Sequence, residues 1–172
     1  MINDVILIDS RENDNKFLLE QFKEMNVKYV TCKLYVGDYM IANKGNIAVD
    51  KKADLVELAG NIANKKDHIR FRNELERAKE ANIKLYILIK DEYIYNIEGV
   101  KYFKSPVYKS NGYKIINGVR IKTHSKGDKV TQANFEALGK AMKTMEEKYG
   151  CKFVFSKKEN FGKKILELLG VI

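Results

Sequence analysis

The sequence has little of what marks secreted, membrane-bound or nucleotide-dependent proteins. Its two cysteines, Cys32 and Cys151, lack the spacing of metal ligands. No apolar run approaches the ~20 residues of a membrane-spanning helix. The N-terminus has no basic stretch leading into an apolar core, as a secretory signal has, and the GxxxxGK and GxGxxG phosphate-binding patterns are missing. We therefore expect a cytoplasmic protein without membrane contact and with free thiols; a disulfide is the alternative left open.

Length and charge indicate one folded domain with a basic segment. A chain of 172 residues with 45% hydrophobic content has enough material for a sizeable core, and we expect a single domain over residues 1–172. The net charge is +9, but residues 101–130 alone carry eight basic residues against one acid, Asp128. Such a segment suits a polyanionic partner, and a solubilising surface explains it equally well.

Apolar periodicity predicts alternating strands and helices over most of the chain. The expected strands are 5–8, 27–34, 84–89 and 151–155. The expected helices are 13–26, 54–63, 66–81, one from Thr131 to Tyr149 with Gly150 as its C-cap, and a last one that starts at Phe161. Alternation of this kind is typical of an α/β sheet with helices on its faces.

A β-hairpin is predicted shortly after the second expected strand. Two short apolar runs flank residues 43–46, which we interpret as a tight turn with Gly45 at positive φ. Asp38 then stands where the first strand begins and Asp50 where the second ends, so the hairpin brings the two carboxylates together. Their repulsion must be offset, and Mg²⁺, which prefers carboxylate oxygens, does this well.

Three short charged segments stand at strand ends in a fixed order. They are Asp9-Ser10-Arg11-Glu12, Gly37-Asp38 and Asp50-Lys51-Lys52. In this order they resemble the nuclease domain of the XPF–Mus family of structure-specific DNA endonucleases, whose hallmark is Gly-Asp, a hairpin, Glu-Arg-Lys and a trailing Asp. The trailing acid is not matched, because Val56 stands at its position and Asp54 comes too early. We therefore give Asp54 no catalytic role.

The resemblance implies a fold and a reaction. The fold is expected to be of the restriction-endonuclease-like superfamily, with a central mixed sheet flanked by helices and an inserted basic β-hairpin at 101–130. The reaction implied is the hydrolysis of phosphodiester bonds in DNA, dependent on Mg²⁺ or Mn²⁺ and specific for flaps, forks or junctions, in repair or recombination. The pattern is similar in style to short, phage-borne members of the family, so we expect the cytoplasm of a bacterium or of a phage-infected cell.

The same resemblance implies five catalytic residues: Asp9, Arg11, Asp38, Asp50 and Lys52. The three aspartates are expected to hold the metal, with Asp9 binding a second ion or orienting water. Lys52 is expected to position or help deprotonate the attacking water, or to stabilise the transition state. Arg11 is expected to hold a phosphate oxygen, for which its planar fork is suited. Taken singly, each residue could equally be a surface charge or part of an ion pair, such as Asp50 with Lys52.

Further basic residues are candidates for DNA contact. They are Lys51, Arg70, Arg72, Lys114, Arg120 and Lys122. Arg70 and Arg72 lie on the expected helix 66–81, and in the resembled family a helix here carries basic residues toward DNA. The alternative is a solvated face on which Glu74 and Glu76 are local partners.

Asn117-Gly118 predicts a type I′ hairpin over residues 113–122. A basic two-stranded ribbon with tyrosines can lie along a nucleic-acid backbone. A mobile insertion and a contact within a homodimer are the alternatives for this segment.

Two other functions are compatible with the same residues. The first is a catalytically silent DNA-binding module that keeps the fold and the basic ribbon. The second is an interaction protein whose basic segment meets an acidic partner. Salt-dependent DNA binding separates the last from the other two, and metal-dependent cleavage separates the nuclease from the silent module.

Overall fold

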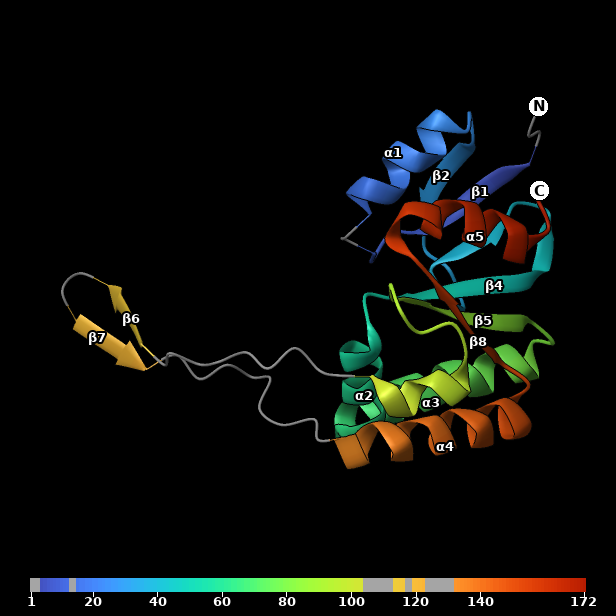
Figure 1. The fold of residues 1–172 in the computed structure, drawn as a ribbon. Helices are drawn as coiled ribbons and strands as arrows, with labels where there is room; N and C mark the ends of the chain where they lie inside the picture. The colour runs from blue at the N-terminus through green and yellow to red at the C-terminus, as the bar shows by residue number, and fades with distance from the viewer. Residues whose placement is uncertain (1–3, 13–14, 104–112, 117–118, 123–131) are drawn as a thin grey trace.

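A six-stranded mixed sheet forms the centre of the molecule (Figure 1). The computed structural model describes residues 4–12, 15–103, 113–116, 119–122 and 132–172. The strand order is β2-β1-β3-β4-β5-β8, with antiparallel pairing of β3 to β1 and to β4 and parallel pairing elsewhere. The strands are β1 (Val5–Asp9), β2 (Lys28–Cys32), β3 (Tyr39–Ile41), β4 (Lys44–Lys52), β5 (Lys84–Lys90) and β8 (Lys152–Ser156). The expected central mixed sheet is confirmed.

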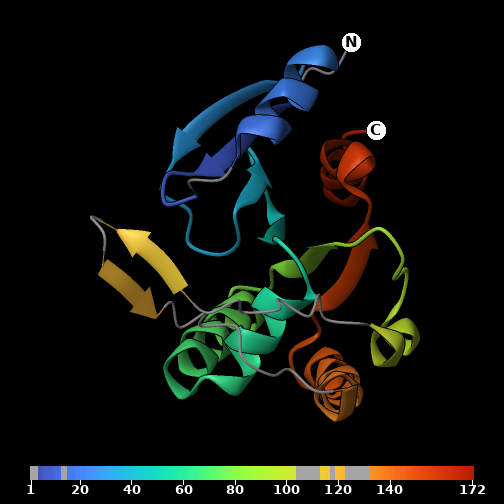
Figure 2. The same cartoon turned by 60° about the vertical axis from the view of Figure 1, so that its left-hand side comes forward.

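Helices cover both faces of this sheet, as Figures 1 and 2 show from two directions. One face carries α1 (Lys16–Glu24) and α5 (Phe161–Leu169), and the other carries α2 (Leu55–Ala63), α3 (Lys65–Glu80) and α4 (Gln132–Tyr149). Two short 3₁₀ helices, η1 (Ile97–Tyr102) and η2 (Lys158–Asn160), connect the later elements. None of the helices within the described residues is long and apolar enough to cross a membrane.

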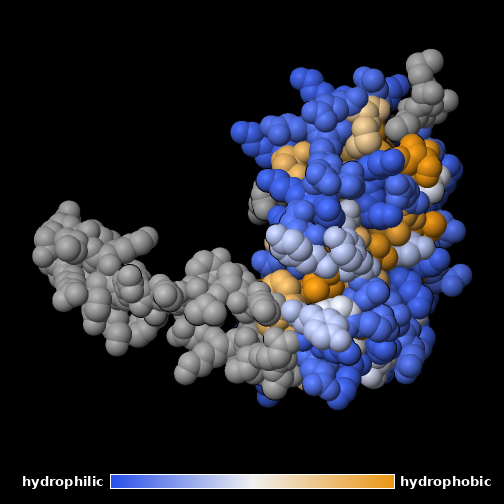
Figure 3. Space-filling view, viewed as in Figure 1, coloured by the Kyte–Doolittle hydropathy of each residue, from blue (hydrophilic) through white to orange (hydrophobic). Residues whose placement is uncertain are grey.

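Side-chain alternation along the strands builds two separate cores. Tyr39 and Val49 point to the side of α1 and α5 and pack in one buried cluster with Phe22 of α1. Met40 and Ala48 point to the other side and join the buried cluster under α2, α3 and α4. Because successive residues of a strand face opposite sides, a strand buried on both faces reads as a continuous apolar run. The outer surface is mostly hydrophilic in the view of Figure 3, with smaller apolar areas between the charged ones.

The β3–β4 hairpin turns earlier in the chain than the predicted residues 43–46. Asn43, not Gly45, takes the left-handed conformation, with φ of 66°, and β4 already begins at Lys44. Ile41 pairs with Lys44 after a register shift next to Met40. The prediction for Gly45 was wrong because asparagine also tolerates positive φ, so a two-residue turn could form before the glycine was reached.

Other element ends follow local backbone chemistry. The first helix is shorter than the expected 13–26, because Asn26 turns to a φ of 54° just after α1 ends. The expected C-cap is confirmed, since Gly150 has a φ of +74° after α4. Asp54 serves as the N-cap of α2 and accepts a hydrogen bond from the Glu57 backbone N–H. The cap expected at Thr131 lies outside the described residues.

Two further strands, β6 (Tyr113–Ile116) and β7 (Val119–Lys122), pair with each other in antiparallel register. Their side chains and residues 117–118 lie outside the described part of the chain. The interpretation of 101–130 as a basic inserted hairpin therefore stays a prediction, as do the DNA contacts of Lys114, Arg120 and Lys122.

Candidate active site

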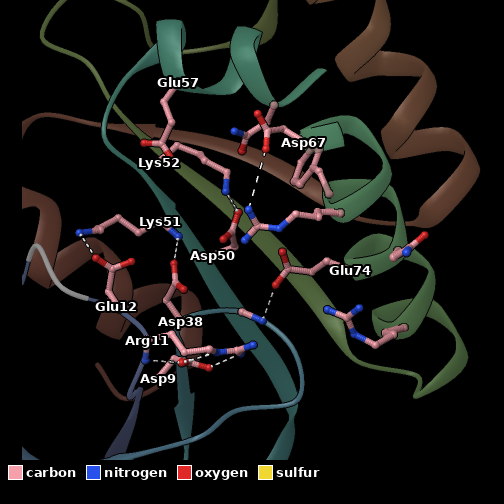
Figure 4. A pocket seen from close by; sticks show the side chains of 16 residues that line it. Asp9, Arg11, Glu12, Asp38, Asp50, Lys51, Lys52, Glu57, Asp67 and Glu74 are labelled. Atoms are coloured by element: carbon pink, nitrogen blue, oxygen red, sulfur yellow. Dashed lines mark hydrogen bonds and ion pairs between the residues drawn. The ribbon is translucent and has the colours of Figure 1, made fainter. Parts of the chain in front are cut away.

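The five residues predicted as catalytic line one open hollow of about 530 Å³ (Figure 4). Asp9 and Arg11 come from the end of β1, and Asp38 comes from the turn that leads into β3. Asp50 and Lys52 come from the last residues of β4. The opposite wall is formed by α3. The sheet order explains this gathering, because β1, β3 and β4 are neighbours in the sheet.

Asp38 is held by backbone contacts on both sides of its turn. Its N–H donates to the Val49 carbonyl at 2.8 Å, and its Oδ2 accepts the Lys51 N–H at 2.7 Å. Gly37 precedes it with φ of +68°, and a Cβ there would lie 3.0 Å from the Val49 oxygen, so glycine is required. Burial and, second, the nearby charge of Asp50 raise the pKa of the Asp38 carboxyl to about 8.

Asp50 and Lys52 form a buried ion pair beside it. Lys52 Nζ lies 2.7 Å from Asp50 Oδ2, and their side chains are 8% and 6% exposed. The contact lacks hydrogen-bond geometry: Asp50 Oδ2 is buried and accepts no hydrogen bond from any described residue. Burial favours the neutral amine of Lys52, but the acidic groups around it, Asp50 above all, together outweigh burial and raise the pKa of Lys52 above its usual range. The amine is therefore protonated at neutral pH.

Asp9 is fully engaged by groups of the protein. Arg11 binds it through Nε at 2.8 Å and through a terminal nitrogen at 2.5 Å, and the Arg11 N–H adds a bond of 2.7 Å. The Leu34 N–H donates to the second oxygen at 3.0 Å. The hydrogen bonds from Arg11 outweigh burial and lower the pKa of Asp9 to about 2. As a metal ligand, Asp9 would first have to release Arg11.

The basic residues predicted to contact DNA take up three different positions. Lys51 lines the hollow, with its side chain 7% exposed and its Nζ 2.9 Å from Glu12. Arg70 stands at the same hollow with a side chain that is 79% exposed. Arg72 does not line the hollow, and its Nε lies 3.6 Å from Glu76 on the helix surface. Of the two arginines predicted to contact DNA, Arg70 is thus the one that a strand of DNA at the hollow can reach.

One family model and two solved structures are similar to this chain. The family model described as the ERCC4 domain matches residues 8–169. The chain belongs to the ERCC4 domain family. XPF from Aeropyrum pernix has a similar fold, with a TM-score of 0.60 at 14% identity over 96% of this chain. XPF from Aeropyrum pernix in complex with DNA gives a TM-score of 0.58 at 14% identity over 98% of it. This chain spans 63% and 64% of those two chains, and no curated protein matches it.

Within this ERCC4 domain, α3 contributes more to the hollow than the sequence analysis predicted. Asn73, Glu74 and Arg77 line it together with Arg70. The four positions follow the i, i+3, i+4, i+7 spacing of a single helix face. The same spacing can be counted in the sequence. Counted from Arg70, it predicts Arg77 rather than Arg72 as the second arginine on the face toward the hollow.

The charges of the ERCC4 domain's hollow fit a divalent cation. Seven carboxylates and five basic side chains line it, which leaves a formal excess of two negative charges among these residues when all of them are ionised. Across the described residues, no three Asp, Glu, His or Cys side chains already stand at metal-ligand spacing. Asp50 Oδ2 is nevertheless a buried oxygen without a hydrogen bond, and Asp38 forms no ion pair with a described residue. Both are hard oxygen donors of the kind that Mg²⁺ prefers.

We expect the free energy of unfolding of the metal-free protein to fall as pH rises between about pH 4 and pH 8. Folded Asp38 keeps its proton up to a pKa of about 8, whereas the unfolded chain releases it near the ordinary value of 3.8. The folded state then binds more protons over this window, and the slope can reach about 1.4 kcal/mol per pH unit. The lowered pKa of Asp9 acts only below this window.

Urea unfolding in the presence of a chelator at pH 5 to 8 measures this slope. Asp38→Asn should flatten it and raise stability at pH 8. Asp4→Asn, which removes a carboxylate paired with Lys44 on the surface, should leave the slope unchanged. A wild-type slope of zero, or an unchanged slope in Asp38→Asn, contradicts the burial of an ionisable Asp38.

Proposed function

We propose that this protein is a DNA endonuclease that hydrolyses phosphodiester bonds with Mg²⁺ or Mn²⁺ and acts on flap, fork or junction DNA in repair or recombination. The observation that carries the proposal is the meeting of Asp38, Asp50 and Lys52 in one open hollow, beside Asp9 and Arg11. An excess of buried acid beside fixed cations is unfavourable for folding. It suits a site that must bind a metal ion and a phosphate together.

Asp38 and Asp50 are the residues that would hold the cation. When bound there, Mg²⁺ or Mn²⁺ supplies Lewis acidity toward the phosphate and makes water a better nucleophile at neutral pH. The two aspartates are fixed for this task before any ion arrives. Asp38 is held through the Lys51 and Val49 backbone, and Asp50 is held by its place in the centre of the sheet, between β3 and β5.

Lys52 and Arg11 supply positive charge where the phosphate would lie. Because the pKa of Lys52 is raised, the role that fits it best is that of a fixed cation that stabilises the charge developing on phosphate oxygens. Arg11 is oriented by Asp9, and its side chain is 62% exposed, so one edge of the guanidinium can reach a phosphate. Asp9 in this role positions Arg11.

The DNA backbone would cross the face of α3. Arg70, Asn73 and Arg77 lie along one side of that helix at the hollow, and side chains of these types are common phosphate contacts. The XPF structure from Aeropyrum pernix in complex with DNA has a similar fold, which supports DNA as the partner here. Lys114, Arg120 and Lys122 would add contacts from the β6–β7 segment.

A catalytically silent DNA-binding module is the second candidate. The observation that favours it is that Asp9 and Asp50 already have cationic partners of their own, Arg11 and Lys52. A site neutralised in this way can persist without a metal ion. The two candidates share DNA binding and differ in cleavage.

Asp50→Asn should abolish cleavage while leaving DNA affinity near the wild-type value, because the change removes a cation-holding charge and keeps the side-chain volume. The assay incubates end-labelled duplex, flap, fork and four-way junction DNA with the protein and with Mg²⁺, Mn²⁺ or a chelator. Wild-type protein should cut at least one branched substrate only when Mg²⁺ or Mn²⁺ is present.

The surface variant Asp4→Asn is the control and should cut as the wild type does. Full activity of purified Asp50→Asn, or cleavage that survives chelation, excludes the proposed site. DNA binding without cleavage on every substrate favours the silent module.

Arg70→Gln should weaken DNA binding and lower the slope of log K against log[salt] by about 0.9 in magnitude, the value of one lost phosphate contact on duplex DNA. Arg72→Gln is the matched control on the same helix. It should leave the slope unchanged, because Arg72 faces Glu76 and not the hollow. Fluorescence anisotropy over a series of salt concentrations measures both. A larger effect of Arg72 than of Arg70 contradicts the proposed path of the DNA.

A further inference from the structure

Glu74 lies on the face of α3 that looks into the hollow, opposite the end of β4. Figure 4 shows its carboxylate turned toward the space around Asp38 and Asp50. Its Oε1 accepts the backbone N–H of Gly37 at 2.9 Å. Across the described residues Glu74 forms no ion pair, although Lys52 and Arg77 are near enough to influence it.

The bond to Gly37 fixes the conformation of the turn that carries Asp38. Gly37 has a left-handed φ of +68°, and its N–H has no strand partner at that point. A carboxylate from another element supplies the acceptor, so α3 and the turn before β3 are tied together directly in front of Asp38. A substitution of Glu74 would therefore act on the backbone of Gly37, the residue directly before Asp38.

The hydrogen bond to Gly37 does not by itself require the charge of Glu74. Burial and, second, the charge of Asp50 raise the pKa of Glu74, so its ionised form is unfavourable where it stands. A neutral glutamine could accept the Gly37 N–H equally well. Lys52 and Arg77 offset this charge in part, and a cation that entered the hollow would give it a further favourable partner.

The trailing acid of the sequence pattern gives a reason for this charge. Its position holds Val56, whose side chain packs against the core under α2. Glu57 stands next to it and lines the hollow, but its carboxylate accepts the Ala53 N–H at 2.7 Å at the start of its own helix. Among the acids that line the hollow from the helices, Glu74 is the one bonded to the turn that carries Asp38.

We propose that Glu74 is a positioning residue of the cation site, which holds the Gly37–Asp38 turn through Oε1 and adds negative charge to the hollow. This inference rests on the proposed function, because it assigns a residue to the same metal site. Different substitutions of Glu74 remove its charge alone or its charge together with the hydrogen bond to Gly37. The two contributions can therefore be measured separately.

The experiment titrates Mn²⁺ into the full chain without DNA and follows the free ion by electron paramagnetic resonance. Glu74→Gln keeps an acceptor for Gly37 and removes the charge, and it should weaken Mn²⁺ binding by about 10-fold or more, as partners of metal ligands typically do. Glu74→Ala removes both and should bind more weakly still. Glu74→Asp keeps the charge and should bind more tightly than Glu74→Gln.

Glu76→Gln is the matched control, since it removes one charge from the same helix on the side that faces Arg72, and its Mn²⁺ affinity should equal that of the wild type. Equal affinity of Glu74→Gln and wild type overturns the inference, and so does weaker binding by Glu74→Asp than by Glu74→Gln. Failure of the wild-type protein itself to bind Mn²⁺ at millimolar concentration overturns the metal-dependent function and this inference together. If the wild type binds Mn²⁺ and cuts DNA but Glu74→Gln does the same, the proposed function stands and only the role of Glu74 fails.

Discussion

The repulsion between Asp38 and Asp50 is the constraint on which the candidate site depends. The sheet places both carboxylates in one hollow, and burial together with this repulsion raises the pKa of Asp38 to about 8. Lys52 offsets one of the two charges at 2.7 Å. The remaining excess of acid among the described residues of the hollow is what a divalent cation would neutralise, so the same imbalance that weakens the metal-free fold would provide affinity for the metal.

The fold creates this imbalance through a few backbone contacts. Gly37 allows the chain to pass close to the Val49 carbonyl, which places Asp38 beside the last residues of β4. Pairing with β5 places that strand end inside the sheet, and Asp50, Lys51 and Lys52 are all buried there. On the far wall, Phe71 and Leu75 anchor α3 in the core, and Arg70, Asn73, Glu74 and Arg77 of the same helix line the hollow. The rigid sheet thus positions the acids, and the helix closes the site.

The sequence was sufficient for those parts that local patterns encode. Apolar runs predicted a sheet with helices on its faces, the family resemblance implied that the sheet is mixed, and the hairpin pattern predicted the meeting of Asp38 with Asp50. The positive φ of Asn43 was missed because both asparagine and glycine tolerate this conformation, and the prediction assigned it to Gly45. Glu74 was assigned only to a solvated face because its partner, the Gly37 N–H, is 37 residues away. Contacts of that range depend on how the helix docks, which periodicity alone does not determine.

The most direct test of the central claim is the thermal unfolding of the wild-type protein at pH 7.5 with increasing Mn²⁺ or Mg²⁺. An ion that binds only the folded state adds about 2.7 kcal/mol at 100 times its dissociation constant, so the midpoint should rise along a saturable curve. The double variant Asp38→Asn/Asp50→Asn should show no such rise. A wild-type midpoint that does not change with either ion, or an equal rise in the double variant, would contradict the account.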